Sequence, residues 1–233
     1  MNISSWSPEG TGAKQACEEM LVSFDEDRPV RILVMPPLFD EANKLRRFTL
    51  SVMRALDEAG IDTALPDLPG MNESLAPLED QTLARWRTHA RAAAAHFGAT
   101  HALTLRGGAL LAPDGLPLWR YAPIKGAKLL TTLLRARFLE AREAGREETR
   151  EALLEIGRMK GLILGGWPIG PDMVRDLETE SSEDHAAYNT FEPSDFDASG
   201  LWLRAEPADD ADQAKALAVR IVQSLNQAGE PSS

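Results

Sequence analysis

The sequence predicts an α/β protein with a mostly parallel sheet and helices on both of its faces. Short apolar runs, typical of buried strands, alternate with stretches in which apolar residues recur every three or four positions, as in amphipathic helices. The first run is VRILVM at 30–35, and the helical pattern of 45–59 follows it. Strands that alternate with helices are joined by right-handed crossovers, which predicts parallel pairing and a sheet covered on both sides.

The later elements continue this alternation along the chain. Strands are predicted at 61–65, 100–105, 117–124 and 200–205, and helices at 78–97 and over the apolar positions from Ala214 to Leu225. The segment 126–179 differs, because it holds two helical stretches and no strong strand. We therefore expect a helical cap inserted over the sheet. Residues 1–29 are polar without periodicity and predict a loosely ordered lead-in to one domain at 30–233.

The composition fits a folded domain and excludes some partners. The 233 residues carry 36 acids and 25 bases, a net charge of −11, so nucleic acid is not an expected partner. We expect a cytoplasmic protein without a transmembrane segment. The sequence has a single cysteine, Cys17, no leader with a basic start and an apolar run, and no apolar stretch of about 20 residues. Eight acids and no bases at 176–203 predict a solvated loop, with an acidic binding surface as the alternative.

The third strand ends in a turn that resembles a catalytic elbow. Ligands of open parallel sheets bind at the carboxyl ends of the strands. Residues 104–108 match the small-residue pattern G-x-S-x-G, but Arg106 occupies the nucleophile position. An arginine stays protonated and cannot attack a carbonyl group. It could hold an anion there, or it could form an internal ion pair with Asp40, Glu41 or Asp67.

The other nucleophiles and bases do not complete a catalytic set. A hydrolase triad of this type ends with a histidine after the last strand. The four histidines are His89, His96, His101 and His185, and all precede the strand predicted at 200–205. Ser74 has no base predictably near it, Ser181 and Ser182 lie in the acidic loop, and Cys17 lies in the lead-in segment without an electropositive setting. No His or Cys spacing fits a metal site and no glycine-rich phosphate loop is present, so no metal and no cofactor are expected.

Several motifs together resemble a known family. They are Pro36-Pro37 followed by Phe39, Glu41, Asn43, Lys44, Arg46 and Arg47, then Asp67–Gly70, Leu105–Leu111 and Gly166–Ile169. The Asp-Leu-Pro-Gly turn and the elbow look like the α/β-hydrolase superfamily. The whole set is similar to the exosortase A system-associated hydrolases of the second type, which show a proline pair running into Glu-x-x-Asn-Lys-x-Arg-Arg, an arginine in the elbow and Gly-Tyr-Pro-Leu in the cap. This chain has Trp167 at the tyrosine position, and the resemblance spans roughly 32–177.

The resemblance implies an α/β-hydrolase-like domain with a helical cap at about 126–179, although the opening hairpin of that fold is not expected here. It also implies a setting in exopolysaccharide production and surface-protein sorting in a Gram-negative bacterium. The favoured hypothesis is a non-catalytic protein, because Arg106 replaces the elbow serine and no late histidine exists. This protein would have a cleft that either binds an anionic ligand or has a structural role only. The cleft would be formed by Arg106, Asn43, Lys44, Glu41 and Asp67. The alternatives are an ester or thioester hydrolase with an unconventional nucleophile, and a protein-interaction module acting through basic cap helices.

Overall fold

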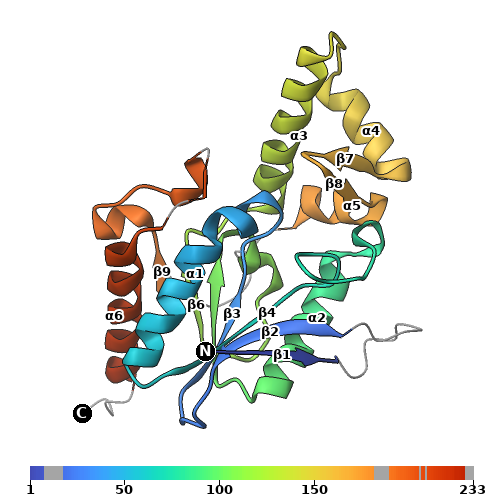
Figure 1. The fold of residues 1–233 in the computed structure, drawn as a ribbon. Helices are drawn as coiled ribbons and strands as arrows, with labels where there is room; N and C mark the ends of the chain where they lie inside the picture. The colour runs from blue at the N-terminus through green and yellow to red at the C-terminus, as the bar shows by residue number, and fades with distance from the viewer. Residues whose placement is uncertain (8–17, 181–188, 205, 208, 229–233) are drawn as a thin grey trace.

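A computed structural model describes residues 1–7, 18–180, 189–204, 206–207 and 209–228. Its main feature is a twisted seven-stranded sheet (Figure 1). In spatial order the strands are β1 (Asn2–Trp6), β2 (Glu19–Phe24), β4 (Asp62–Pro66), β3 (Arg31–Met35), β5 (His101–Leu105), β6 (Leu118–Tyr121) and β9 (Asn189–Phe191). The pairs β1–β2 and β2–β4 are antiparallel and the other four are parallel. The predicted mostly parallel α/β fold is confirmed.

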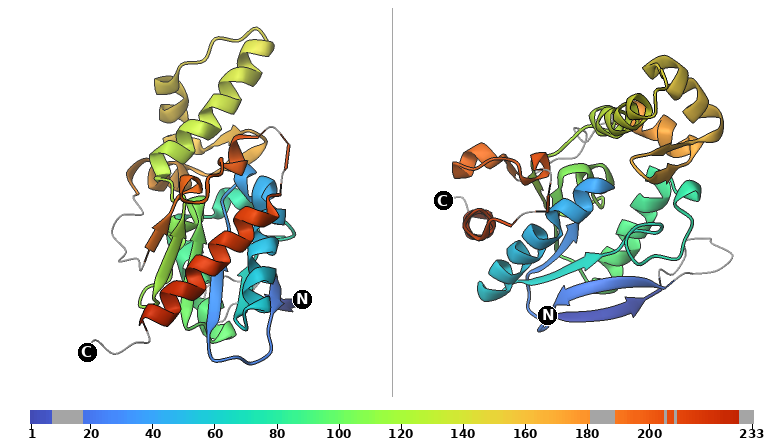
Figure 2. Two further views of the ribbon diagram at one scale, coloured as in Figure 1. Left: turned by 90° about the vertical axis from the view of Figure 1, so that its left-hand side faces the viewer. Right: turned by 45° about the horizontal axis from the view of Figure 1, so that its top comes forward.

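Helices cover both faces of this sheet. They are α1 (Asp40–Glu58) and α6 (Ala211–Ala228) on one face and α2 (Leu83–Phe97) on the other. Figure 2 shows α6 running beside α1. A hydrophobic core lies on each face of the sheet, and β3 contributes side chains to both, because successive residues of a strand point to opposite faces. Ile32 and Val34 pack with α1 and α6, whereas Leu33 and Met35 pack with α2 and the cap.

The cap lies over the carboxyl ends of the strands, at the predicted place in the chain (Figure 1). It consists of α3 (Gly126–Glu143), α4 (Arg150–Lys160), α5 (Pro171–Thr179) and a small hairpin of β7 (Leu162–Leu164) and β8 (Trp167–Ile169). The hairpin corrects the expectation of a purely helical cap. Its two-residue turn is Gly165-Gly166, and both residues have positive φ, as a tight hairpin turn requires.

The expectation of a loosely ordered segment at 1–29 is wrong for the residues that the structure describes there. β1 and β2 form an antiparallel hairpin, so the opening hairpin that the sequence did not predict is present. β2 is held by pairing on both sides, and most of its residues are buried. β1 lies at the edge of the sheet, and only its last residue, Trp6, is buried. An edge strand with polar exposed side chains lacks the apolar pattern that identifies a strand from sequence. Residues 8–17 lie outside the described part of the chain.

The prediction of a strand at 200–205 is also wrong. Residues Leu201–Leu203 form a 3₁₀ turn, η4, in which Leu201 is buried and Leu203 is 78% exposed. The last strand of the sheet is instead β9, which lies within the stretch predicted as a solvated acidic loop. Part of that stretch also belongs to α5, so the loop prediction fails at both ends, and residues 181–188 lie outside the described chain.

Across the described residues, no helix is both long and apolar enough to cross a membrane.

Candidate functional site

The elbow after β5 has the strained backbone of a nucleophile turn. Arg106 has a φ of 53° and begins a 3₁₀ turn, η2 (Arg106–Leu111). A non-glycine residue with positive φ is uncommon and is held in place only by its surroundings. Here the surroundings are tight, since a Cβ added at Gly108 would lie 2.5 Å from the carbonyl oxygen of Pro36 and 2.6 Å from that of Met35. The elbow is therefore packed directly against the end of β3.

Arg106 forms the internal ion pair that was one of its two predicted roles, and the partner is Glu41. Arg106 Nε donates to Glu41 Oε2 at 3.0 Å and Nη2 donates to Oε1 at 2.9 Å, while Nη1 donates to the carbonyl oxygen of Ala122 at 2.9 Å. The arginine is 7% exposed and the glutamate 6%. The ring of Trp202, in η4, covers the guanidinium with 3.7 Å between Cζ and the ring centroid. The nucleophile position is thus filled by a buried, two-point ion pair.

The five predicted site residues separate into four places. Arg106 and Glu41 meet beneath Trp202, as described. Lys44 binds Asp40 one turn earlier on α1 at 2.9 Å, at the surface. Asp67 is buried after β4, where its Oδ1 accepts from Arg46 Nη1 at 3.3 Å and from Asn72 Nδ2 at 2.8 Å. Asn43 is exposed on α1, and its side chain makes no hydrogen bond to any described residue. The structure therefore does not gather them into one cleft.

A polar cavity lies beside the elbow, between the core and the cap, and the sequence did not identify it. Its volume is about 460 Å³, and it is lined by Met20, Asn43, Arg46, Gly70, Asn72, Glu73 and Trp167. These residues come from β2, α1, the loop after β4 and the cap hairpin. Four of them, Asn43, Arg46, Gly70 and Trp167, belong to the motifs that carried the family resemblance. Nothing in the sequence shows that Trp167 of the cap and Met20 of β2 reach the same space.

Behind the cavity, a buried carboxyl group orders the loop after β4. Ser74 Oγ donates to Glu19 Oε1 at 2.9 Å and accepts from the backbone N–H groups of Gly70 and Ala76. Burial and the nearby charge of Asp67 raise the pKa of Glu19 to about 7, against the opposing effect of the bond from Ser74. Glu19 Oε2 and Asp67 Oδ2 have no hydrogen-bond partner among the described residues. Ser74 is thus a loop-forming serine bonded to a carboxyl group.

The histidines that can be located are packed as structural side chains. His89 is 1% exposed, and its Nε2 lies 3.0 Å from the carbonyl oxygen of Asp67. Burial lowers the pKa of His89 to about 4, so the ring is neutral at pH 7. His96 stacks on Trp6, and the ring of His101 stacks on an indole of β6. The remaining residues of this kind, His185, Ser181, Ser182 and Cys17, lie outside the described chain. Within the described part, no three His, Cys, Asp or Glu side chains cluster as a metal site would require.

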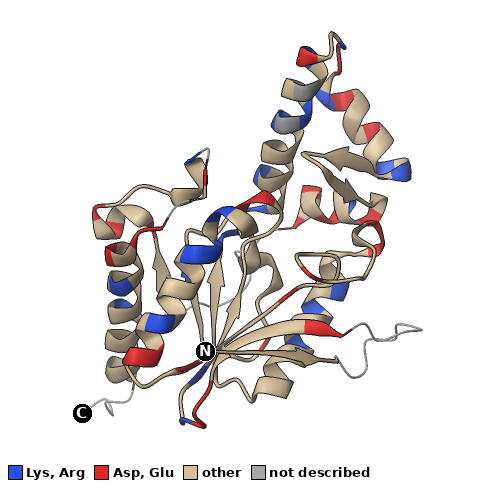
Figure 3. Cartoon of the chain, in the orientation of Figure 1, with Lys and Arg blue, Asp and Glu red and all other residues tan. Residues whose placement is uncertain are grey.

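Several basic residues of the cap pair with acidic residues of the cap, and Figure 3 shows Lys and Arg interspersed with Asp and Glu along α3 and α4. Arg137 binds Glu148 through two hydrogen bonds of 2.9 and 2.7 Å. Arg158 binds Glu178 in the same way, and Arg150 donates to the hydroxyl of Thr131 at 3.0 Å. This arrangement fits a solvated face joined by local pairs, so the structure adds no support for an interaction module based on these helices.

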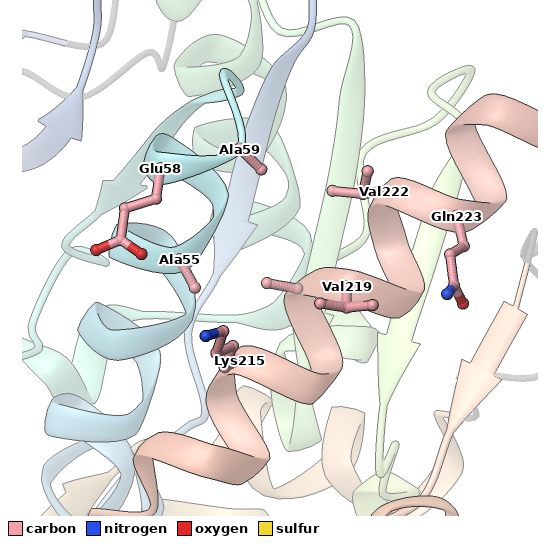
Figure 4. A pocket seen from close by; sticks show the side chains of 8 residues that line it. Ala55, Glu58, Ala59, Lys215, Val219, Val222 and Gln223 are labelled. Carbon is pink, nitrogen blue, oxygen red and sulfur yellow. The ribbon is translucent and has the colours of Figure 1, made fainter.

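A second groove lies between α1 and α6 (Figure 4). It has a volume of about 270 Å³ and is lined mainly by alanine and valine side chains, with Glu58, Lys215 and Gln223 as its polar residues. Small-molecule sites combine an apolar wall with several polar groups that converge on the ligand. In Figure 4 the side chain of Gln223 points away from the facing helix, so this groove lacks such convergence. The cavity beside the elbow is the better candidate.

Comparisons with known proteins agree with this architecture. No protein-family model matches the sequence, and no curated protein matches it. Among solved structures, Alpha/beta hydrolase domain-containing protein 10 from mouse matches with a TM-score of 0.57 and 10% identity, over 98% of this chain and all of that chain. Est1E from Butyrivibrio proteoclasticus matches with a TM-score of 0.48 and 16% identity, over 78% and 72% of the two chains. A protein of Agrobacterium vitis S4 matches with a TM-score of 0.45 and 19% identity, over 65% of this chain and 66% of that one.

The identities are too low to carry a function, but the match to the mouse protein extends over almost the whole chain. Strand order, the cap after β6 and the elbow after β5 agree with that result. This chain therefore has the α/β-hydrolase fold.

Proposed function

We propose that this chain is a non-catalytic protein built on the α/β-hydrolase fold, and that it acts by binding at the boundary between core and cap. The observation that carries the proposal is the state of the elbow. Arg106 stands where the attacking serine would be, and three of its five N–H groups donate to Glu41 and to the Ala122 carbonyl. A protonated guanidinium held in this way offers no nucleophile.

The end of the chain supports the same proposal. The turn that precedes α6 brings Trp202, rather than a histidine, against the elbow residue. An indole ring has no basic nitrogen and cannot accept a proton from a nucleophile. Among the residues that the structure describes, neither of the two groups that hydrolysis of this kind requires therefore lies at the elbow.

The cellular setting is part of the proposal and rests on the resemblance of the motifs at 36–47, 67–70, 105–111 and 166–169. They are similar to the exosortase A system-associated hydrolases of the second type, so we place the protein with exopolysaccharide production, in the cytoplasm. Asn43 and Arg46 of the first motif line the cavity beside the elbow, which gives part of the motif a binding role without catalysis.

Two assays test the proposal on the purified full-length chain. A fluorophosphonate probe should not label it, and it should not hydrolyse p-nitrophenyl acetate, p-nitrophenyl butyrate or an acyl thioester above the rate in buffer alone. The matched control is the Glu41→Gln, Arg106→Gln double variant. Labelling, or turnover that this double variant abolishes, would overturn the proposal and favour a hydrolase with an unconventional nucleophile. Turnover that survives in the double variant would also overturn it, since it would place chemistry elsewhere in the chain.

A further inference from the structure

The polar cavity beside the elbow offers hydrogen-bond donors and acceptors together. Arg46 uses one N–H on Asp67, at a long 3.3 Å, and has no other hydrogen bond to the described chain. The amide of Asn43 makes none, and neither does the carboxylate of Glu73. Asn72 donates to Asp67, which leaves its Oδ1 as an acceptor. A ligand here would meet guanidinium and amide donors beside amide and carboxylate acceptors.

The charges around the cavity do not favour an anion. Arg46 is the one cation among the described residues that line the cavity, and it already contacts the buried carboxylate of Asp67. Glu73 adds a second negative charge on the wall of the cavity. Lys44, the nearest predicted cation, is bound to Asp40 and does not line the cavity. An anionic ligand would therefore enter a site whose positive charge is already balanced by acids.

The cap contributes an aromatic ring to the same cavity. Trp167, at the start of β8, is half-buried, and Phe39 packs edge-on to it with 6.1 Å between ring centroids. This contact holds the indole at the junction of core and cap. Met20 of β2 gives the cavity a second apolar side chain. An indole face is a large, rigid apolar surface that suits the C–H side of a ring-shaped ligand.

We infer that this cavity binds a neutral, polyhydroxylated molecule. Hydroxyl groups both donate and accept, so one such ligand could donate to Glu73 and Asn72 while it accepts from Arg46 and Asn43. Its C–H face would lie on Trp167. A volume of about 460 Å³ is within the range of small-molecule sites, roughly 300–1,000 Å³. The inference rests on the proposed function, because it gives a ligand class to the non-catalytic binding at the boundary of core and cap.

Titration followed by NMR tests the inference on the full chain. The five tryptophans give five indole N–H signals, and a spectrum of Trp167→Phe identifies the one that belongs to Trp167. The neutral probes are methyl α-D-glucopyranoside and myo-inositol, and the anionic probe is inorganic phosphate. We expect the neutral probes to shift the Trp167 signal in a saturable way at concentrations up to about 10 mM. Phosphate should leave it unchanged.

Variants of neighbouring residues show whether the shift arises in this cavity. Arg46→Gln should weaken binding of the neutral probe about tenfold or more, since it removes a charged donor. The matched control is Arg47→Gln, because Arg47 is adjacent, exposed and not part of the lining. Arg46→Gln could unfold the loop by leaving Asp67 unpaired. Asn43→Leu and Glu73→Gln are therefore included, since both side chains are exposed and without hydrogen bonds in the described chain.

Glu73→Gln separates the two ligand classes. A neutral polyol loses a charged acceptor and binds more weakly, whereas an anion loses a repelling charge and binds more tightly. The inference is overturned if neither neutral probe shifts the Trp167 signal, if Arg46→Gln and Arg47→Gln have equal effects, or if phosphate binds and Glu73→Gln strengthens it. Turnover of p-nitrophenyl acetate by the same sample would refute the non-catalytic function alone, and polyol binding at Arg46 would still stand.

Discussion

The indole ring of Trp202 lies over the guanidinium of Arg106, 3.7 Å from Cζ to the ring centroid. This contact joins the turn before α6 to the elbow after β5. A cation over an aromatic face contributes about 0.5–2 kcal/mol, with the larger values at desolvated sites. We predict that Trp202→Leu lowers the free energy of unfolding by about 1–2 kcal/mol in urea denaturation, and that Trp202→Phe loses less. Equal stability of the Leu variant and the wild type would contradict this role.

The ion pair between Arg106 and Glu41 predicts strong non-additivity. Removing one partner leaves a buried charge uncompensated, which costs about 3–5 kcal/mol. Glu41→Gln and Arg106→Gln should each lower the free energy of unfolding by that amount, and the double variant should be more stable than the sum of the two losses predicts. The matched control is the surface pair of Lys44 and Asp40, for which neutralising either residue should cost less than about 1 kcal/mol. Additive losses at the buried pair would show that the two side chains are not coupled.

Glu19 predicts a stability change with pH that is opposite to the usual one for a carboxyl group. Its pKa is about 7 in the folded chain against an ordinary value of 4.5, so between these values the folded state holds a proton that the unfolded state has lost. Stability from this group is full below pH 4.5 and is lost as the pH rises toward 7. The free energy of unfolding of Glu19→Gln minus that of the wild type should therefore increase across this window. The increase is on the order of 3 kcal/mol, since the two pKa values differ by about 2.5 and each pKa unit is about 1.4 kcal/mol.

His89 changes the free energy of unfolding with pH in the opposite direction to Glu19. The Glu19 prediction is therefore tested on the difference between the variant and the wild type. Burial lowers its pKa to about 4 from 6.5, so its contribution to stability is lost as the pH falls from 6.5 to 4. The two effects partly cancel in the wild type between pH 4.5 and 6.5. Subtracting the wild-type curve from that of Glu19→Gln removes the contribution of His89. A difference that stays constant with pH would refute the raised pKa of Glu19.

The close approach at the elbow predicts an unequal pair of glycine variants. An alanine at Gly108 would place its Cβ against the carbonyl oxygens of Pro36 and Met35, which are backbone atoms that cannot rotate away. An alanine at Gly107 would meet only the side chain of Leu38, at 2.9 Å. We expect Gly108→Ala to cost more than about 3 kcal/mol and Gly107→Ala clearly less, as measured by thermal and urea unfolding. A reversed order would show that the strand end and the elbow can separate.

The central strands and α1 could be predicted because burial on both sides gives each of them a clear apolar pattern. The same reasoning failed where an element is stabilised by its neighbours. β1 is polar because it is an edge strand, and the apolar residues at 201–203 serve a turn that covers Arg106. β9 has only three residues and lies in a stretch of acids. It therefore lacks the apolar pattern of a buried strand, and its pairing with β6 could not be predicted.

The candidate site shows the same division. Glu41 could be proposed as a partner of Arg106, because β3 and β5 are neighbours in a parallel sheet and their carboxyl ends meet at one edge. The cavity beside the elbow could not be predicted. It depends on how the cap hairpin and β2 are placed relative to α1, and that placement is a property of tertiary packing.

Several non-glycine residues with positive φ in the described chain follow strands of the sheet, among them Phe39 after β3, Arg106 after β5 and Ala122 after β6. Such conformations cost about 1–3 kcal/mol each and are usually linked to chemistry. In this chain the elbow keeps that conformation although its side chain is an arginine in an ion pair. An unusual backbone angle at this position is thus a property of the turn and does not require a nucleophile at its apex, whereas the side chain there decides which chemistry is open to it. The chemistry of a chain with this fold should therefore be judged from that side chain and not from the turn.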